Sequence, residues 1–208
     1  MTSINTITLE VADIAAAERF YTAAFGLGSR LRLRAAQEQT TGFRGFTLSL
    51  IVSQPADVEL LFQSAVDAGA TVLKPVAKNM WGCGGVVQAP DGTIWKVATP
   101  AKKDTRPPSR EVQNIVLLLG ASDVAASRKF YTGHGFTVAK SFARMYVEFA
   151  AGEGPIKLGL YRRRALAKDA GVPPEGSGAH RIAIGGDGGS FTDPDGFAWE
   201  ATTSAALS

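Results

Sequence analysis

The side chains best suited to nucleophilic catalysis are few in this chain. It has one cysteine, Cys83, and two histidines, His134 and His180. A cysteine nucleophile is usually activated by a neighbouring histidine, so Cys83 has only two potential partners. The glycines around Cys83, in the stretch WGCGG, could suggest a phosphate-binding loop, but that loop opens a helix and this stretch precedes a predicted strand. The sequence therefore favours neither a cysteine nucleophile nor a phosphate loop.

Two charged residues hold equivalent places in two similar motifs. Lys96 and Glu200 each follow a Pro-Asp-Gly turn by four residues. A lysine or a carboxyl group that is desolvated in a cavity can act as an acid or a base. Side chains alternate between the faces of a strand. If Lys96 and Glu200 face a cavity, the preceding residues Trp95 and Trp199 therefore face the helices and pack in the core.

These two motifs belong to an internal repeat. Segments 4–27 (INTITLEVADIAAAERFYTAAFGL) and 114–136 (NIVLLLGASDVAASRKFYTGHGF) share an apolar run, an aspartate and a stretch that ends in Phe-Tyr. Segments 89–99 (APDGTIWKVAT) and 193–203 (DPDGFAWEATT) share the Pro-Asp-Gly turn, which is typical of a connection between two strands. The chain therefore consists of two similar halves.

The opening segment of each half is a predicted strand followed by a helix. Residues 6–11 alternate between polar and apolar side chains, which is typical of a half-buried strand. Asp13 and Asp123 are good helix N-caps, and apolar residues then recur at helical spacing until glycines end each helix. Residues 46–53 predict a further strand, and 56–68 a second helix.

The polar, proline-rich segment 100–110 is the predicted linker, which gives two domains, 1–104 and 105–208. Each half lacks something that the other has. Residues 35–45 leave too little chain for a hairpin, whereas a hairpin is expected within 144–163. The second half has the stretch GGDGG in place of a second helix. Either the sheets complete one another across the chain or in a dimer, or segments are missing.

Composition excludes several classes of protein. The 208 residues are 45% apolar and 20% charged, as in an ordinary globular protein. The net charge is only +3, and the densest basic cluster, Arg162–Arg164, is interpreted as a solvated strand end or loop. The sequence shows no signal peptide and no apolar run near the ~20 residues of a membrane helix. A single cysteine fits a reducing compartment. We expect a cytoplasmic protein without nucleic-acid or membrane partners.

The order and double occurrence of these motifs resemble the vicinal-oxygen-chelate superfamily, which includes glyoxalases, bleomycin-resistance proteins and extradiol dioxygenases. The resemblance covers nearly the whole chain. It rests on the strand–Asp–helix–Phe-Tyr opening and on the Pro-Asp-Gly-x-x-Trp-Glu/Lys close. It implies an α+β fold, in which tandem βαβββ modules build curled mixed sheets around a cavity with the helices outside.

The resemblance also implies where metal ligands would lie. Metal-dependent relatives have a His on the first strand, a His or Gln on the strand that opens the second half of the domain, and a Glu four residues after the Pro-Asp-Gly turn. The matching positions are Thr6, Thr47 and Lys96 in one half, and Asn114 or Val116, Arg181 and Glu200 in the other.

Only Glu200 among these residues suits a divalent metal, and a catalytic site normally needs about three protein ligands. A salt bridge from Glu200 to Arg181 is the preferred interpretation. His180 is expected to face away from the cavity, and His134 to have a capping or surface role at a helix end. We therefore expect no cofactor, with a divalent metal held partly by Glu200 as the alternative.

The leading functional prediction is metal-independent binding of a small hydrophobic, aromatic or anionic compound. A metal-dependent lyase, isomerase or dioxygenase is the second hypothesis. A structural or interaction module, whose sheets complete each other in a homodimer, is the third. The predicted ligand-binding residues are Thr6, Thr8, Thr47, Ser49 and Lys96 in one cavity, Asn114, Arg181 and Glu200 in the other, and Trp81 in a loop near the strand ends.

Overall fold

The structure is a computed structural model that describes residues 2–202. Residue 1, at the start of the first predicted domain, and residues 203–208, at the end of the second, lie outside the described residues. The helices are α1 (Ile14–Ala24), α2 (Pro55–Asp67), α3 (Val124–Gly133) and α4 (Arg163–Ala170), with a short 3-10 helix η1 (Gly28–Arg30). The strands are β1 (Ile4–Val11), β2 (Leu31–Ala35), β3 (Thr40–Gly42), β4 (Phe46–Ile51), β5 (Thr71–Asn79), β6 (Gly82–Gln88), β7 (Ile94–Thr99), β8 (Asn114–Ala121), β9 (Val138–Phe142), β10 (Tyr146–Phe149), β11 (Ile156–Arg162), β12 (Gly176–Gly178), β13 (Ile182–Gly186), β14 (Phe191–Thr192) and β15 (Ala198–Ala201).

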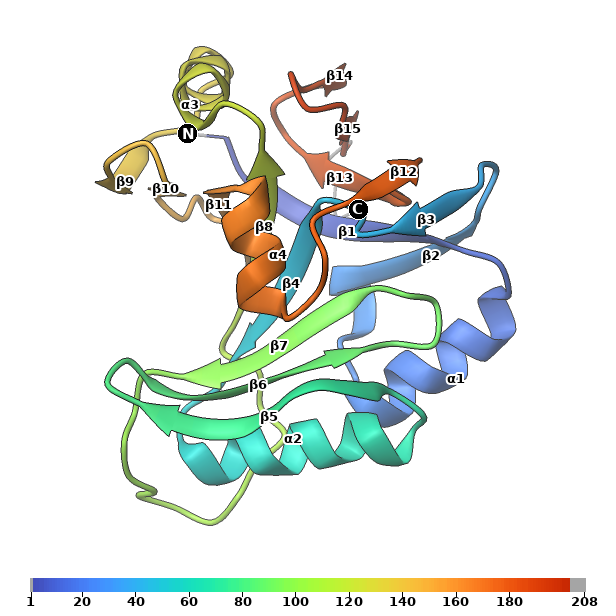
Figure 1. Cartoon of the computed structure of the whole chain (residues 1–208), viewed down its shortest axis with the longest axis vertical. Helices are drawn as coiled ribbons and strands as arrows, with labels where there is room; N and C mark the ends of the chain where they lie inside the picture. The colour runs from blue at the N-terminus through green and yellow to red at the C-terminus, as the bar shows by residue number, and fades with distance from the viewer. Residues whose placement is uncertain (1, 203–208) are drawn as a thin grey trace, which may run out of the picture.

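Thirteen of the strands form one continuous mixed sheet with two parts, which join where Ile4 of β1 pairs with Ile156 of β11. The part that we call the larger sheet has the order β9-β10-β11-β8-β4-β7-β6-β5. The part that we call the smaller sheet has the order β14-β15-β13-β1-β2. Strands β3 and β12 form a separate two-stranded sheet. The α+β architecture with mixed, curved sheets is the one expected from the sequence (Figure 1).

Each sheet is assembled from both halves of the chain. Strand β4 pairs with β8 in the middle of the larger sheet, and β1 pairs with β13 in the smaller one. Of the alternatives left open by the sequence, the sheets therefore complete one another within the chain. The predicted boundary between residues 104 and 105 lies in the connection from β7 to β8, and it does not separate the two sheets.

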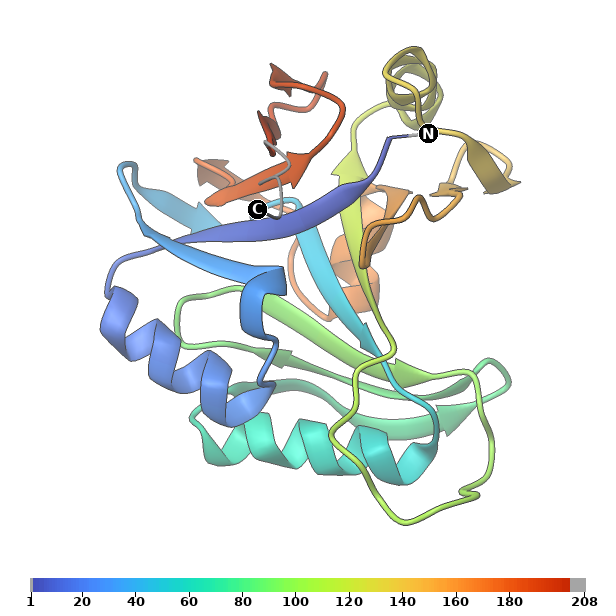
Figure 2. The same cartoon turned by 180° about the vertical axis from the view of Figure 1, so that it is seen from behind.

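The helices α1 and α2 pack side by side against the outer face of the sheets (Figures 1 and 2). The Asp13 side chain accepts a hydrogen bond of 2.9 Å from the amide of Ala16, and Asp123 caps α3 in the same way. Because the N-cap satisfies an amide that the first turn leaves unpaired, it positions the helix start. Within residues 2–202, none of the helices has the length and apolar character that crossing a bilayer requires.

The repeated aromatic motifs form two matching buried contacts behind the sheets. In the first half, the Tyr21 hydroxyl donates to Asp91 at 2.7 Å, and the Trp95 indole donates to the Tyr21 hydroxyl at 3.3 Å. In the second half Tyr131 and Trp199 make similar contacts, at 2.6 and 3.2 Å, but the acceptor of the Tyr131 hydroxyl is Asp193, which directly precedes the Pro-Asp-Gly turn. Both tryptophans are almost fully buried, so the prediction that they face the core is confirmed.

Burial changes the acid–base properties of these groups. Desolvation, with the nearby carboxylate as a second cause, raises the pKa of Tyr21 and of Tyr131 well above the ordinary value. Desolvation also raises the pKa of Asp193, against the lowering effect of the hydrogen bond from Tyr131. These contacts have a structural role, because they connect α1 to a Pro-Asp-Gly turn and α3 to the residue that directly precedes the other such turn.

The two halves differ where the sequence predicted that they would. The first half has β2 directly beside β1 and reaches β4 through the short β3, without a hairpin added to the sheet. The second half has the hairpin β10–β11, and the described residues contain no helix between β13 and β14. It has instead α4, which the sequence analysis missed, directly after β11.

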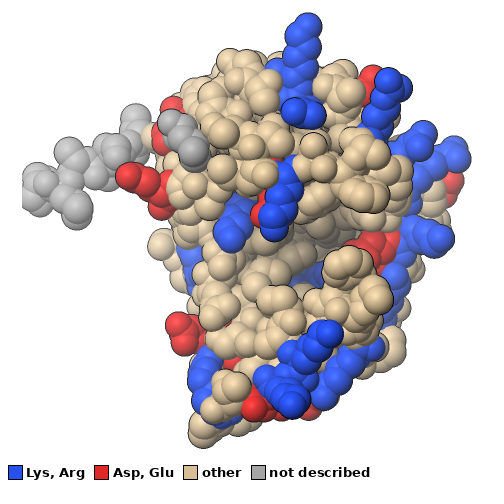
Figure 3. All heavy atoms as spheres, turned by 90° about the vertical axis from the view of Figure 1, so that its left-hand side faces the viewer, with Lys and Arg blue, Asp and Glu red and all other residues tan. Residues whose placement is uncertain are grey.

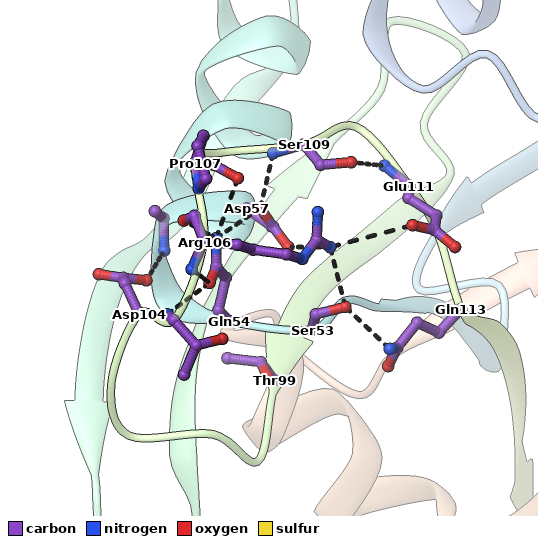
Figure 4. A network of polar contacts seen from close by, with 12 residues as sticks. Ser53, Gln54, Asp57, Thr99, Asp104, Arg106, Pro107, Ser109, Glu111 and Gln113 are labelled. Atoms are coloured by element: carbon purple, nitrogen blue, oxygen red, sulfur yellow. Dashed lines mark hydrogen bonds and ion pairs between the residues drawn. The ribbon is translucent and has the colours of Figure 1, made fainter.

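The predicted linker is tied down to the start of α2 (Figure 4). The fully buried Asp57 accepts hydrogen bonds from the Ser109 amide at 2.7 Å and from the Arg106 guanidinium at 3.1 Å. Gln54 accepts from the amides of Thr105 and Arg106, at 2.8 and 3.1 Å. Residues 104–113 therefore form a segment, which we call the strap, that crosses the N-terminus of α2.

Candidate functional site

The concave face of the larger sheet carries one row of side chains in register across five strands. Successive strand pairs align Val86 with Lys96, Lys96 with Ser49, Ser49 with Val116, and Val116 with Lys157. The residues next to them along each strand, such as Leu48, Leu50 and Val97, are fully buried on the helix side. Because side chains alternate between faces, the row faces the inside of the curve, where Lys96 and Lys157 bring positive charge.

Helix α4 fills part of this concave face. It contacts β8, β11 and β4 (Figure 1). Its apolar side chains pack on Val86, Ile94 and Leu118 of the sheet; they are Leu166, Ala167 and Ala170. Thr47 and Ser49 are buried on this same side of β4. A ligand therefore cannot use the whole concave face, and the space that remains lies beside the end of α4.

This remaining space is a hollow of about 610 Å³, which we call the concave hollow. Figure 3 views the molecule from the left-hand side of Figure 1 and shows a hollow on this face with Lys and Arg side chains around it. The residues that matter for its chemistry are Ile51, Lys74, Trp81, Lys96, Ala98 and Asp169. Most ligand pockets have volumes of roughly 300–1,000 Å³, so the concave hollow has room for a small organic molecule.

Two lysines on different strands converge in the concave hollow. Lys96 on β7 forms an ion pair of 3.0 Å with Asp169 near the end of α4. Lys74 on β5 donates to the backbone carbonyls of Lys168 and Asp169, at 2.9 and 2.6 Å. The side chains of Lys96 and Asp169 are 35% and 42% exposed, so solvent and small ions reach this pair. The arrangement is suited to binding an anion.

Trp81 and Cys83 complete the wall of the hollow on the β6 side. Trp81 is 82% exposed in the turn between β5 and β6, so its indole ring is free to stack on an aromatic ligand. Cys83 is buried, and desolvation raises the pKa of its thiol. A nucleophilic cysteine needs the opposite shift, so its environment supports the sequence analysis in rejecting a cysteine nucleophile.

The predicted ligand-binding residues group differently from the prediction. Asn114 is aligned with Ile51 on the larger sheet, whereas Thr6 and Thr8 lie on β1 of the smaller sheet. The structure thus places Thr47, Ser49, Lys96 and Asn114 on one sheet, and Thr6, Thr8 and Glu200 on the other. The expected division by sequence halves is wrong because each sheet takes strands from both halves. Lys96 and Trp81 line the concave hollow together.

Glu200 has a different partner from the one expected. Its carboxylate binds Arg34 of β2 at 2.8 Å, and the same guanidinium binds Glu10 of β1 at 2.7 Å. Arg181 lies just before β13 with a positive φ of 55° and donates to the backbone carbonyl of Glu38. The predicted Glu200–Arg181 salt bridge is therefore wrong. Since Arg34 occupies the Glu200 carboxylate, this position is not suited to a metal ion.

The side chains at the family's metal positions do not fit a divalent metal. On the larger sheet these positions hold Thr47, Lys96, and Asn114 or Val116. They offer neutral oxygens at most and one cation, and none of them is a carboxylate, histidine or cysteine. Among residues 2–202, no three His, Cys, Asp or Glu side chains come together. His180 binds the carbonyls of Arg44 and Asp195.

His134 has the capping role that the sequence predicted. It is the C-cap of α3, and its imidazole lies 2.9 Å from the Phe130 carbonyl oxygen. Neither histidine of the chain is therefore positioned as a ligand or a base in the concave hollow.

Sequence reasoning missed Lys74 and Asp169, which define the cationic end of the hollow. The basic cluster Arg162–Arg164 begins at a strand end, as expected, because β11 ends at Arg162; Arg163 and Arg164, however, open the helix α4. The spacing of three apolar residues and a following glycine was a usable signal for this helix; they are Leu166, Ala167, Ala170 and Gly171. No local signal in the sequence linked Asp169 to Lys96.

Comparison with known proteins places this architecture. No protein-family model matches the sequence, and no curated protein matches it. Among solved structures, glyoxalase I from Zea mays superposes with a TM-score of 0.64 at 17% identity, over 97% of this chain and 92% of that chain. A putative dioxygenase from Bacillus subtilis superposes with a TM-score of 0.55 at 12% identity, over 93% of this chain and 71% of that chain. The resemblance read from the sequence is thus confirmed at the level of the fold, because the chain has the fold of glyoxalase I.

Proposed function

We propose that this protein binds a small aromatic compound with an anionic group, without a metal, in the concave hollow. The observation that carries the proposal is the convergence of Lys74, Lys96 and Trp81 on one hollow of about 610 Å³. The lysines supply charge for a carboxylate or similar group. The indole of Trp81 supplies an aromatic face, and Ile51 and Ala98 supply apolar walls. Such a mixture of apolar surface and a few polar groups is typical of ligand sites.

Metal-dependent lyase, isomerase or dioxygenase chemistry is the competing proposal. Its support is the fold, which is shared with a protein named glyoxalase I. Folds of this kind host many functions, so the site must decide. At the family's metal positions the larger sheet has Lys96, which would repel a cation, and the smaller sheet has Glu200, which is paired with Arg34. These side chains favour ligand binding without a metal.

The remaining expectations stay proposals. A buried thiol in a chain with a single cysteine suits a reducing compartment such as the cytoplasm. The partner we expect is a small molecule rather than a nucleic acid or a membrane. A homodimer stays a prediction of the sequence.

Calorimetric titration with benzoate, 1-naphthoate and uncharged benzyl alcohol tests the proposal. We expect both anions to bind and the alcohol to bind much more weakly. A partly exposed lysine contributes about 1 kcal/mol, so Lys96→Gln should weaken naphthoate binding about fivefold. Trp81→Ala should weaken naphthoate more than a small alkyl carboxylate. The matched control is Lys103→Gln, an exposed lysine outside the hollow, which should change neither affinity.

Two results would count against the proposal. Absence of binding by every aromatic anion at millimolar concentration would remove the ligand class. Elemental analysis of the purified protein provides the second check. A stoichiometric divalent metal that is lost in Glu200→Gln would favour the metal-dependent alternative.

A further inference from the structure

The end of α4 supplies the polar partners of both lysines in the concave hollow. Lys96 pairs with the carboxylate of Asp169, and Lys74 donates to two carbonyl oxygens in the last turn of the helix, those of Lys168 and Asp169. A helix C-terminus carries partial negative charge, so the last turn of α4 presents three oxygen atoms to two ammonium groups. The last turn of α4 thus occupies the place at the two lysines where an anionic ligand would bind.

Apolar packing anchors the helix, whereas the Asp169 side chain is held by an ion pair that solvent reaches. Leu166, Ala167 and Ala170 are buried against the sheet. Gly171 ends the helix in the left-handed conformation at φ 81°, and an added Cβ there would lie 3.1 Å from the Lys74 Cε. By contrast, the Asp169 side chain is 42% exposed, and among residues 2–202 its carboxylate binds Lys96. Asp169 can therefore rotate away from Lys96 while α4 keeps its place.

We propose that Asp169 is an internal competitor, whose carboxylate occupies at Lys96 the subsite that the carboxylate of a ligand takes when it binds. This inference rests on the proposed function and narrows it to carboxylate-bearing ligands. The exchange replaces one carboxylate on Lys96 by another, so Lys96 has a carboxylate partner in both states. Because exposed ion pairs contribute little to stability, a ligand can displace Asp169 readily. Asp169 thereby sets a threshold that selects against weak or uncharged ligands.

A double-mutant cycle on Lys96 and Asp169 tests the competition, with 1-naphthoate as the probe. In the presence of Lys96, we expect Asp169→Asn to tighten naphthoate binding about two- to fivefold, the range for an exposed pair. In the Lys96→Gln background, the same substitution should leave naphthoate affinity unchanged, because no cation remains to compete for. Glu18→Gln on the distant helix α1 is the matched control for the loss of one negative charge (Figure 1).

The outcomes separate this inference from the proposed function. If naphthoate binds the wild type, and Lys96→Gln weakens binding while Asp169→Asn does not tighten it, the competition is refuted and the proposed function stands. Tightening by the same factor in the Lys96→Gln background, or in Glu18→Gln, would show a general charge effect and would also refute the competition. If neither the wild type nor Asp169→Asn binds naphthoate, both proposals fail. Asp169→Ala repeats the test with a smaller side chain and should behave as Asp169→Asn does.

Discussion

A buried carboxylate, Asp57, binds the strap that joins the two halves, and its removal should substantially lower the stability of the protein. Asp57 is fully buried and accepts hydrogen bonds from the Ser109 amide, the Gln54 side chain and Arg106. Replacing it with alanine leaves the Ser109 amide without its partner and Arg106 without its buried counter-ion. A hydrogen bond to a charged group contributes about 1.5–3 kcal/mol.

The ion pair with Arg106 contributes less to the free energy of unfolding, because the Arg106 side chain is 36% exposed. Such a pair adds at most about 1 kcal/mol. We therefore expect Asp57→Ala to lower the free energy of unfolding by about 2–4 kcal/mol. Asp57→Asn should lose about half as much, because its amide oxygen still accepts from Ser109 while its amide nitrogen faces Arg106. For a chain of this length, a loss of 3 kcal/mol corresponds to a fall in Tm of roughly 6–12 °C.

Urea denaturation followed by tryptophan fluorescence measures this change, because Trp95 and Trp199 are buried in the folded protein. The control is Glu111→Gln, whose carboxylate is 71% exposed and 3.9 Å from Arg106; it should change the unfolding free energy by less than about 0.5 kcal/mol. A loss below about 1 kcal/mol in Asp57→Ala would refute the reasoning. It would mean that water satisfies the Ser109 amide and that the strap is held elsewhere.

Three further predictions concern the buried and charged groups. Burial raises the pKa of Asp193 in the folded protein, so its contribution to stability is fully present below about pH 3.9, the unfolded value, and is lost as the pH rises through the folded pKa. The free energy of unfolding of the wild type, minus that of Asp193→Asn, should therefore decrease as the pH is raised from 3 to 7. Denaturation at several pH values measures it, and an increase of this difference with pH would contradict the prediction. Burial also raises the pKa of Cys83, so a thiol reagent such as dithionitrobenzoate should modify it far more slowly in the native protein than in urea; equal rates would refute its burial. Arg34→Ala removes the partner of Glu10 and Glu200, but the Arg34 side chain is 42% exposed and solvent screens these ion pairs. Thermal denaturation should therefore show a loss of at most about 1 kcal/mol in the free energy of unfolding. A loss of about 3 kcal/mol would show that solvent does not screen the cluster.

Features set by neighbouring residues were predictable from the sequence. Asp13 and Asp123 cap helices because the cap depends on amides a few residues away. Trp95 and Trp199 face the core because strand alternation is a local rule. The repeat of these local patterns was also enough to identify the fold.

Features set by distant pairing were not predictable in this way. Strand partners depend on which apolar faces meet in space, so the grouping of strands from both halves into each sheet could not be derived from single segments. Glu200 pairs with Arg34, which is 166 residues away, rather than with the nearer Arg181. The contact of Asp169 with Lys96 depends on α4 lying across the concave face, where only the packing of Leu166 and its neighbours places it.

The pairing of β1 with β13 has a consequence for biosynthesis. Ile7 is aligned with Ile184, so roughly 180 residues must be made before β1 meets this partner. At about 5–20 residues per second, β1 waits for roughly 10–35 s with one edge uncovered. An uncovered apolar strand edge is a site of aggregation. During translation, β1 can pair early with β2 on its other side. The nascent chain should depend on chaperones until β13 has left the ribosome and pairs with β1.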